Sequence, residues 1–323
     1  MQVRLKVKRF DPERPEEKER FQEYSVDMPE HATVLESLLE VRDYEDGTLA
    51  LRCSCRSSIC GSCAMRINGR ARLACKTQVR SLTAEGADEV VVEPPGNMPV
   101  IKDLVVDMAP FWDQVRAVKP WLQPSGPPPE REYLVPNEAM TALTEVMNCI
   151  MCGACVSDCT VLEVDPTFLG PAALAKAWRF VGDPRDSDDL ARLREYSEPS
   201  GMWDCTRCNM CVQVCPKDVK PMDLILKLRA KATHAGVTGN YGARHTEAFV
   251  ELVEHSGRLD EFRLPILTHG KLNVLGQLSD LPVALRMIRS GKLPSPFHKR
   301  IGGIKHIKRI FRRFAKQPSG GSH

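Results

Sequence analysis

The chain has 323 residues, of which 42% are hydrophobic and 27% charged, and its formal net charge is +3 at pH 7. This length allows two domains plus extensions, and the apolar fraction supports packed cores. No apolar stretch approaches the roughly 20 residues that cross a bilayer, and the N-terminus lacks the features of a secretory signal. We therefore expect a cytoplasmic chain without a transmembrane segment, peripheral to any membrane partner.

The first domain, residues 1–105, is predicted as a small mixed α/β unit. Apolar and polar residues alternate at Val3–Val7 and at Tyr24–Met28, which is the period of a β-strand. The segment Ala32–Val41 has helical spacing instead. A hairpin is expected around Asn68-Gly69, a dipeptide typical of type I′ turns, and Glu89–Glu93 is predicted as a last strand. This order is compatible with a β-grasp fold, although periodicity alone does not choose it over other α+β arrangements.

Proline-rich sequence follows. Residues 106–136 include Pro124-Ser125-Gly126-Pro127-Pro128-Pro129 and are predicted as a linker. Ile101–Trp112 has enough apolar residues for a helix packed on one of the domains. Residues 137–239 turn helical, most clearly at Ala172–Phe180 and Met222–Lys231, and are predicted as a second, helical domain.

Residues 240–323 contain no cysteine and are predicted as a helical extension. Between Lys292 and Lys316 there are nine Lys/Arg and no acidic residue, which leaves −6 for the rest of the chain. Isoleucines and phenylalanines from Ile301 to Phe314 approximate a helical stripe surrounded by basic residues. Such a helix is typical of a segment that lies on an anionic membrane surface or docks a partner. A solvated terminal helix fits equally well. The tail Pro318–His323 is predicted to be disordered.

The thirteen cysteines occur in three tight clusters, a pattern that suits metal ligation better than disulfides between distant segments. The first cluster has C-x4-C-x2-C spacing, followed after eleven intervening residues by a fourth cysteine. This is the plant-type [2Fe–2S] pattern, with the predicted ligands Cys55, Cys60, Cys63 and Cys75. A small-residue loop suits it, because backbone N–H groups must turn inward to the sulfurs. Cys53 does not give the four-residue spacing and is predicted not to be a ligand.

Two further runs have the spacing C-x2-C-x2-C-x3-C of bacterial ferredoxins. In that pattern three cysteines of one run hold a cluster and the fourth ligates the other cluster. One cluster is therefore expected on Cys149, Cys152, Cys155 and Cys215, and the other on Cys159, Cys205, Cys208 and Cys211. The proline that follows Cys215 is replaced by Thr160 in the first run.

The chain is thus predicted as α+β: an N-terminal β-grasp [2Fe–2S] ferredoxin domain, an α-helical bacterial-ferredoxin-type domain with two cubane-type clusters, and a helical extension. Three clusters suit one-electron conduction. The sequence contains no glycine-rich phosphate loop, and its eight histidines are scattered, so we expect no catalytic residue on this chain. The alternative from another class is a zinc-stabilised assembly module without a redox role.

At these residues the chain resembles the iron–sulfur subunit of succinate dehydrogenase and fumarate reductase, part of respiratory complex II and the tricarboxylic acid cycle. The resemblance runs from about residue 1 to 231, through the cysteine motifs and segments such as Leu73-Ala74-Cys75, Pro99–Met108 and Lys119-Pro120-Trp121-Leu122. It implies a flavoprotein partner with FAD, which interconverts succinate and fumarate. Electrons would pass from the [2Fe–2S] site to the Cys149 site, then to the Cys205 site and a membrane quinone. No nucleic-acid partner is expected.

The sequence departs from this family at the third cluster. Most members have a non-cysteine residue at the position of Cys208 and hold a [3Fe–4S] cluster, so a [4Fe–4S] cluster is predicted here, with [3Fe–4S] as the alternative. Leu162-Glu163-Val164 replace tryptophans that shape a quinone site, and Thr206 replaces a histidine. The resemblance then implies a membrane anchor with cysteine-rich repeats instead of haem b. A related thiol- or heterodisulfide-coupled fumarate reductase is the alternative redox function.

Overall fold

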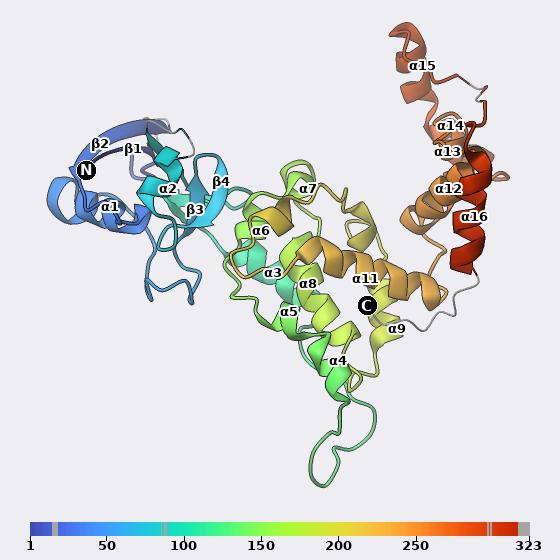
Figure 1. Ribbon diagram of the computed structural model, residues 1–323, viewed down its shortest axis with the longest axis horizontal. Coiled ribbons are helices and arrows are strands. Elements are labelled where there is room, and N and C mark those ends of the chain that lie inside the picture. The colour runs from blue at the N-terminus through green and yellow to red at the C-terminus, as the bar shows by residue number, and fades with distance from the viewer. Residues whose placement is uncertain (15–18, 85, 87–88, 296, 298, 316–323) are drawn as a thin grey trace. The chain divides into compact units, whose positions relative to one another are not determined.

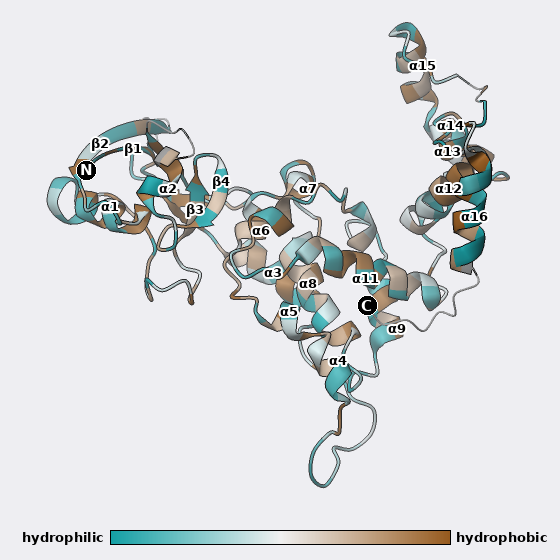
Figure 2. Cartoon of the chain, viewed as in Figure 1, coloured by the Kyte–Doolittle hydropathy of each residue, from teal (hydrophilic) through white to brown (hydrophobic). Residues whose placement is uncertain are grey.

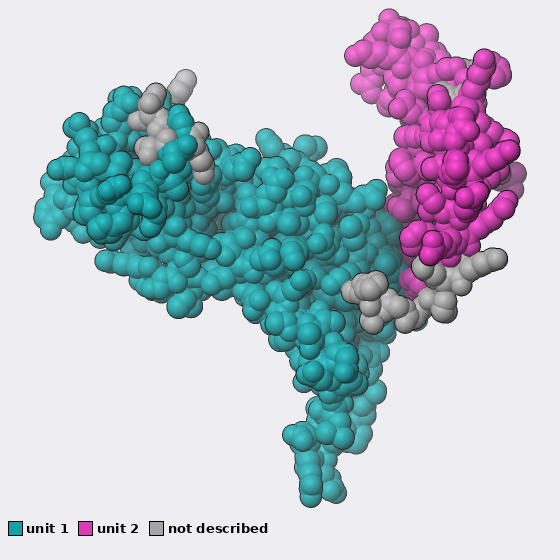
Figure 3. All heavy atoms as spheres, in the orientation of Figure 1, with its two compact units in different colours: residues 1–231 teal, residues 232–323 magenta. Residues whose placement is uncertain are grey.

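The computed structural model describes residues 1–14, 19–84, 86, 89–295, 297 and 299–315. The chain forms two compact units, Met1–Lys231 (unit 1) and Ala232–His323 (unit 2), coloured separately in Figure 3. The predicted domain at residues 1–105, the predicted linker and residues 137–231 of the predicted second domain lie within unit 1, whereas residues 232–239 of that predicted domain belong to unit 2. The tail predicted to be disordered lies outside the described residues.

Unit 1 begins with a five-stranded mixed sheet, whose strand order is β2-β1-β5-β3-β4 (Figure 1). β1 pairs antiparallel with β2 and parallel with β5, and β3 pairs antiparallel with both β4 and β5. The strands are β1 (Gln2–Arg9), β2 (Arg20–Asp27), β3 (Ala64–Ile67), β4 (Arg70–Leu73) and β5 (Val90–Glu93). The predicted strands and hairpin are confirmed, and both Asn68 and Gly69 have the positive φ of a type I′ turn.

A helix packs against this sheet. α1 (Val34–Glu40) starts at a capping box in which Thr33 and Glu36 satisfy each other's backbone N–H groups. Its apolar side packs into the main core with the sheet residues Leu5 and Ile67. The chain continues as a π-helical turn, Val41–Glu45, and a short helix, α2 (Val79–Ala84), follows the hairpin. This helix-on-sheet arrangement is compatible with the predicted β-grasp fold.

The predicted helix at Ile101–Trp112 is wrong in its first half. Residues 100–106 form a β-ladder, β6 (Val100–Lys102) and β7 (Val105–Val106), and helix α3 spans Ala109–Ala117. The reason is Asp103, which turns the chain with a positive φ and is almost fully buried. Its carboxylate accepts hydrogen bonds from the Arg9 side chain and from the backbone of Phe10 and Ala50. These long-range partners outweigh local helical propensity.

The rest of unit 1 is helical, as predicted. Its helices are α4 (Asn137–Thr141), α5 (Thr144–Met147), α6 (Ala154–Ser157), α7 (Thr160–Val164), α8 (Gly170–Val181), α9 (Asp189–Glu195), a 3₁₀ turn (Met202–Asp204), α10 (Met210–Gln213) and α11 (Pro221–His234). Helix α8 is at the centre: Ala173, Leu174 and Ala177 on it are buried, and α3, α5, α6 and α9 contact it. Pro171 lies in its first turn as predicted.

The first part of the predicted linker is hydrogen-bonded to a buried arginine of the helical domain. Arg192 on α9 is fully buried and forms an ion pair of 3.1 Å with Asp186, which is also buried. Its guanidinium donates hydrogen bonds to the carbonyl groups of Val118, Lys119 and Trp121. The first part of the linker is therefore anchored to the helical domain.

We expect Arg192→Leu to lower the free energy of unfolding by about 3–5 kcal/mol, because it removes the positively charged partner of a buried carboxylate and a hydrogen-bond donor to three carbonyl groups. The matched control is Arg194→Leu, an exposed arginine on the same helix, for which a change within about 0.5 kcal/mol is expected. Denaturant unfolding of the cluster-loaded chain measures both. Equal midpoints for the two variants would contradict this role.

Unit 2 contains five helices among its described residues: α12 (Tyr241–Ser256), α13 (Arg263–His269), α14 (Val274–Ser279), α15 (Leu281–Arg289) and α16 (Ile304–Ala315). The helix predicted around Ile301–Phe314 is confirmed as α16. Throughout the described part of the chain, no helix has the length and hydrophobicity to span a bilayer.

Candidate iron–sulfur sites

The first cysteine loop turns its backbone N–H groups toward the sulfurs. The N–H groups of Ser57, Ile59 and Cys60 point at Sγ of Cys55 over 3.3–3.4 Å. That of Ser58 points at Sγ of Cys75, at 3.4 Å. Positive φ angles at Arg56 and Ser58 bend the loop inward. Hydrogen bonds to sulfur of this kind stabilise thiolates that ligate iron, so the loop fits a [2Fe–2S] cluster.

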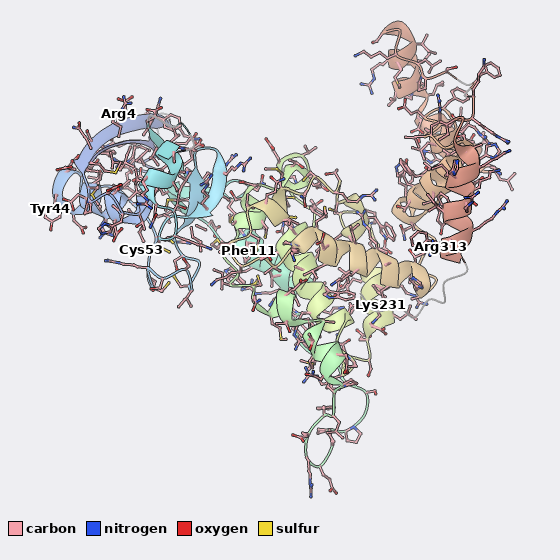
Figure 4. The ribbon with its side chains drawn as sticks, viewed as in Figure 1. Arg4, Tyr44, Cys53, Phe111, Lys231 and Arg313 are labelled. Carbon is pink, nitrogen blue, oxygen red and sulfur yellow. The ribbon has the colours of Figure 1, made fainter. Side chains whose placement is uncertain are left out.

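The hairpin carries the fourth cysteine back to this loop. The backbone N–H of Ala74 donates to the carbonyl of Cys63 at 3.0 Å, which places Cys75 beside the loop. Cys63 is buried, Cys55 and Cys75 are half-buried, and Cys60 is exposed. Cys53, labelled in Figure 4, is half-buried and packs against the main core, as Cys75 does. The prediction that it is not a ligand stays a prediction.

The two bacterial-type runs line two cavities in the helical domain. The first cavity is lined by Cys149, Cys152, Cys155 and Cys215, with alanines and prolines around them. The second is lined by Cys159, Cys205, Cys208 and Cys211, with Phe168, Met222 and Ile225. The fourth cysteine of each run thus lies with the first three of the other run. No Asp, Glu or His is among the described residues that line either cavity, so the donors are the sulfurs that iron–sulfur clusters use.

The two runs have the same backbone conformation. In the first run, the second and fourth residues after the first cysteine position, Met151 and Gly153, have positive φ. In the second run, Arg207 and Asn209 occupy the same places and also have positive φ. These left-handed residues wrap each loop around its cavity and start the short helices α6 and α10. Sequence reasoning identified the cysteine repeat but not this repeated conformation, although glycine and asparagine are residues that adopt it readily.

Burial controls the pKa values of these thiols. It raises the pKa of Cys63 and Cys211 to about 12 and that of Cys152 to about 11. The pKa of Cys60 is lowered to about 6 by a hydrogen bond with the Ser62 side chain and by backbone N–H groups. Metal coordination deprotonates a thiol outright. Bound iron would therefore supply the positive charge that the buried thiolates need.

Cys208 is exposed, yet it faces the second cavity. The hydroxyl group of Thr160 on α7 donates a hydrogen bond to its sulfur, over 3.4 Å. Although burial alone raises the pKa of Cys208, hydrogen bonds from Thr160 and from the backbone lower it overall. Arg229 on α11 fixes the segment before this run, because its guanidinium donates to the carbonyl groups of Met202 and Cys205. Neither Thr160 nor Arg229 was singled out as a supporting residue from sequence.

The [2Fe–2S] loop lies directly against the first cavity. Gly61 is so close to Cys152 that a Cβ atom on Gly61 would lie 2.7 Å from the Cβ atom of Cys152. Gly61 also has a φ of +75°, a conformation that glycine adopts without strain. The first two sites are therefore in van der Waals contact through their cysteine loops.

A second set of contacts joins the domains at the start of α7. The amide of Asn97 donates to the carbonyl groups of Val156 and Cys159, at 2.8 and 3.0 Å. The carboxylate of Asp158 accepts a hydrogen bond of 2.9 Å from the backbone of Ala71 on β4. These bonds position the cysteine that crosses to the second cavity. They join residues about 60 to 90 positions apart, so no local sequence signal could have identified them.

Comparisons with known protein families agree with this arrangement. Residues 4–113 match the model of a 2Fe-2S iron-sulfur cluster binding domain, and residues 145–219 match that of a 4Fe-4S dicluster domain. The chain is 35% identical over 269 residues to the 8-methylmenaquinol:fumarate reductase iron-sulfur subunit of Wolinella succinogenes, covering 82% of this chain and 83% of the relative. It is 40% identical over 234 residues to the fumarate reductase iron-sulfur subunit of Mycobacterium tuberculosis, covering 72% and 93%.

The chain belongs to the iron–sulfur subunits of succinate dehydrogenases and fumarate reductases. It therefore has the electron-transfer role of this family within an oxidoreductase complex. A solved structure, the Mycobacterium smegmatis Sdh1 complex in the apo form, contains a chain that matches with a TM-score of 0.63 and 27% identity. That match covers 72% of the present chain and 96% of the other.

The zinc-stabilised alternative is not favoured by these relatives. A structural zinc ion needs four ligands at about 2.0–2.3 Å from one point. In a [4Fe–4S] cluster each thiolate instead bonds its own iron, and in a [2Fe–2S] cluster the four thiolates are divided between two irons, so the sulfurs stand further apart. Among the described residues, no group of three or more Cys, His, Asp or Glu is placed to hold a single metal ion.

Proposed function

We propose that this iron–sulfur subunit holds three clusters in series, and that each cluster has four cysteine ligands. The first would be a [2Fe–2S] cluster on Cys55, Cys60, Cys63 and Cys75. The second would be a [4Fe–4S] cluster on Cys149, Cys152, Cys155 and Cys215, and the third a [4Fe–4S] cluster on Cys159, Cys205, Cys208 and Cys211. When bound, such clusters take up and release one electron each.

The observation that carries this proposal is that the fourth cysteine of each run, Cys159 or Cys215, lines the cavity formed by the first three cysteines of the other run. Bacterial ferredoxins use this crossed ligation, and it accounts for all eight cysteines of the two runs. The protein's own contribution is to hold the thiols, to surround them with apolar side chains that exclude water, and to aim N–H groups at the sulfurs of the first site. The contact between Gly61 and Cys152 keeps the first two sites close enough for rapid electron transfer.

We propose further that the chain works between a flavoprotein subunit with FAD and a membrane anchor, on the cytoplasmic face of the membrane. The Wolinella relative is named for 8-methylmenaquinol and fumarate, and we extend this reaction class, quinol oxidation coupled to fumarate reduction or its reverse, to the present chain. Thr206 lines the second cavity, and Val164, three residues after the cavity-lining Val161, is 85% exposed. The absence of aromatic or imidazole groups at these positions favours an anchor with cysteine-rich repeats over a haem b anchor.

Anaerobic purification of the whole complex from its native host tests this function. We expect a flavoprotein subunit to co-purify, together with activity between succinate or fumarate and a quinone. Activity with fumarate and thiols but not with quinones would instead establish the thiol-coupled alternative. A colourless preparation that contains zinc and no acid-labile sulfide would refute the redox role altogether.

A further inference from the structure

The charge of the chain is divided unequally between its two units. Residues 232–323 contain 15 Lys/Arg and 6 Asp/Glu, whereas residues 1–231 contain 30 Lys/Arg and 36 Asp/Glu. From Leu281 to the C-terminus there are 11 Lys/Arg and no acidic residue. Unit 2 is therefore strongly basic on a chain whose remainder is acidic, and its field attracts anionic surfaces.

Helix α16 presents this charge to solvent. Its half-buried apolar residues, Ile304, Ile307 and Phe311, are spaced for one side of the helix, and α16 packs beside α12. The basic residues on the other side are exposed, namely Lys305, His306, Arg309, Arg312 and Arg313 (the last labelled in Figure 4). Packing within unit 2 thus covers part of the apolar stripe of α16, although Ile310 and Phe314 remain 52% and 69% exposed, and leaves its basic side in solvent.

Helices α14 and α15 expose apolar side chains instead. In α15, Leu281, Ala284, Leu285 and Ile288 follow the i, i+3, i+4, i+7 spacing of one helical side. Leu285 and Ile288 are 50% and 55% exposed, and the preceding Leu272 and Leu275 are 95% and 83% exposed. Neither helix has a buried residue. Figure 2 shows brown, apolar ribbon on α15 and alternating brown and teal bands on α16.

The exposed apolar side of α15 and the exposed basic side of α16 together indicate the kind of surface that unit 2 binds. An exposed apolar stripe bordered by Arg286 and Arg289, and followed by a long basic segment without acidic residues, is the composition of a helix that lies in a bilayer interface. A protein partner would also have to provide an acidic face, because unit 2 offers no acidic residue after Asp280. Anionic lipid supplies both an apolar interior and a negative surface.

We propose that unit 2 docks this subunit onto an anionic membrane surface, with α15 inserted at the interface and the basic side of α16 bound to lipid headgroups. The docking surface belongs to unit 2 alone. It stands whichever reaction the complex catalyses.

Flotation of the full, cluster-loaded chain with phosphatidylcholine vesicles, made with or without phosphatidylglycerol, tests this docking. We expect binding only to the anionic vesicles. The triple variant Lys305→Glu/Arg309→Glu/Arg312→Glu should weaken it at least about 100-fold, since each basic residue near such a surface contributes about fivefold. The matched control, Arg70→Glu/Arg131→Glu/Arg194→Glu, makes the same charge change at exposed sites of unit 1 and should bind nearly as tightly as the unchanged chain.

A second pair of variants tests the contribution of the apolar side of α15. Leu285→Ser/Ile288→Ser should weaken vesicle binding by about tenfold for each residue, whereas Leu134→Ser/Leu190→Ser, at exposed leucines of unit 1, should not. Equal binding to both vesicle types, or no binding by the unchanged chain, would overturn the proposal. So would unchanged vesicle binding by the charge variant together with loss of another subunit from the purified complex, a result that would identify a protein partner for this surface.

Discussion

Cys208→Ala is expected to convert the third site from a four-iron to a three-iron cluster. Cys208 is the one thiol of that set without a counterpart in the common family pattern, and it is exposed, so the remaining three cysteines can still hold a smaller cluster. The iron content should fall from about ten to about nine per chain, and an oxidised-state [3Fe–4S] signal should appear in low-temperature EPR. The potential of this site should rise, because a negatively charged ligand has been removed.

The matched control for this substitution is Cys53→Ala. Cys53 packs against the main core near the first loop and is predicted not to bind iron. This variant should keep the iron content and every EPR signal of the unchanged protein. If Cys208→Ala left the EPR spectrum and the iron content unchanged, Cys208 would not be a ligand. If Cys53→Ala removed the [2Fe–2S] signal, the first ligand set would be wrong.

Gly61→Ala is expected to disrupt the contact between the first two sites. Its added Cβ atom would lie 2.7 Å from Cβ and 2.9 Å from Cα of Cys152, so one of the two cysteine loops must move. We expect loss of most of the [2Fe–2S] signal, or a marked decrease in the magnetic coupling between the reduced first and second clusters. EPR of the fully reduced chain measures both quantities.

Gly69→Ala is a close control for this change. Gly69 has a φ of +76°, almost equal to that of Gly61, but a Cβ atom there would meet nothing within 4 Å. Both substitutions therefore carry the same backbone strain, of about 1–2 kcal/mol, and only Gly61→Ala adds the clash. Equal effects of the two would show that strain, and not contact between the loops, is responsible.

The cysteine spacing allowed the sets of neighbouring cysteines to be predicted, because three cysteines of each set lie within a few residues of one another in the sequence. Three thiols within a few residues must converge, and the two cavities contain the sets expected from crossed ligation. The contacts that join the sites were not predictable, because Asn97 and Gly61 meet partners far along the chain. The ladder at residues 100–106 was mistaken for a helix for the same reason: the buried partners of Asp103 come from Arg9 and Ala50.

The C-terminal helix shows a different limit of sequence reasoning. Its amphipathic pattern correctly predicted α16, but the pattern did not show that its apolar stripe packs beside α12. The packing of unit 2 shows which helix exposes which kind of side chain. The basic side of α16 faces solvent, and α15 exposes its leucines. Amphipathicity predicts that a helix has an apolar side but does not identify what covers it.

EPR of the unmodified, anaerobically purified subunit, combined with iron and sulfide analysis, is the most direct test of the three-cluster arrangement. We predict about ten iron and ten sulfide per chain, three clusters that become paramagnetic on reduction, and no signal from an oxidised [3Fe–4S] cluster. A stoichiometric [3Fe–4S] signal in the oxidised state, present without oxidative damage, would contradict it and return the third site to the common family pattern.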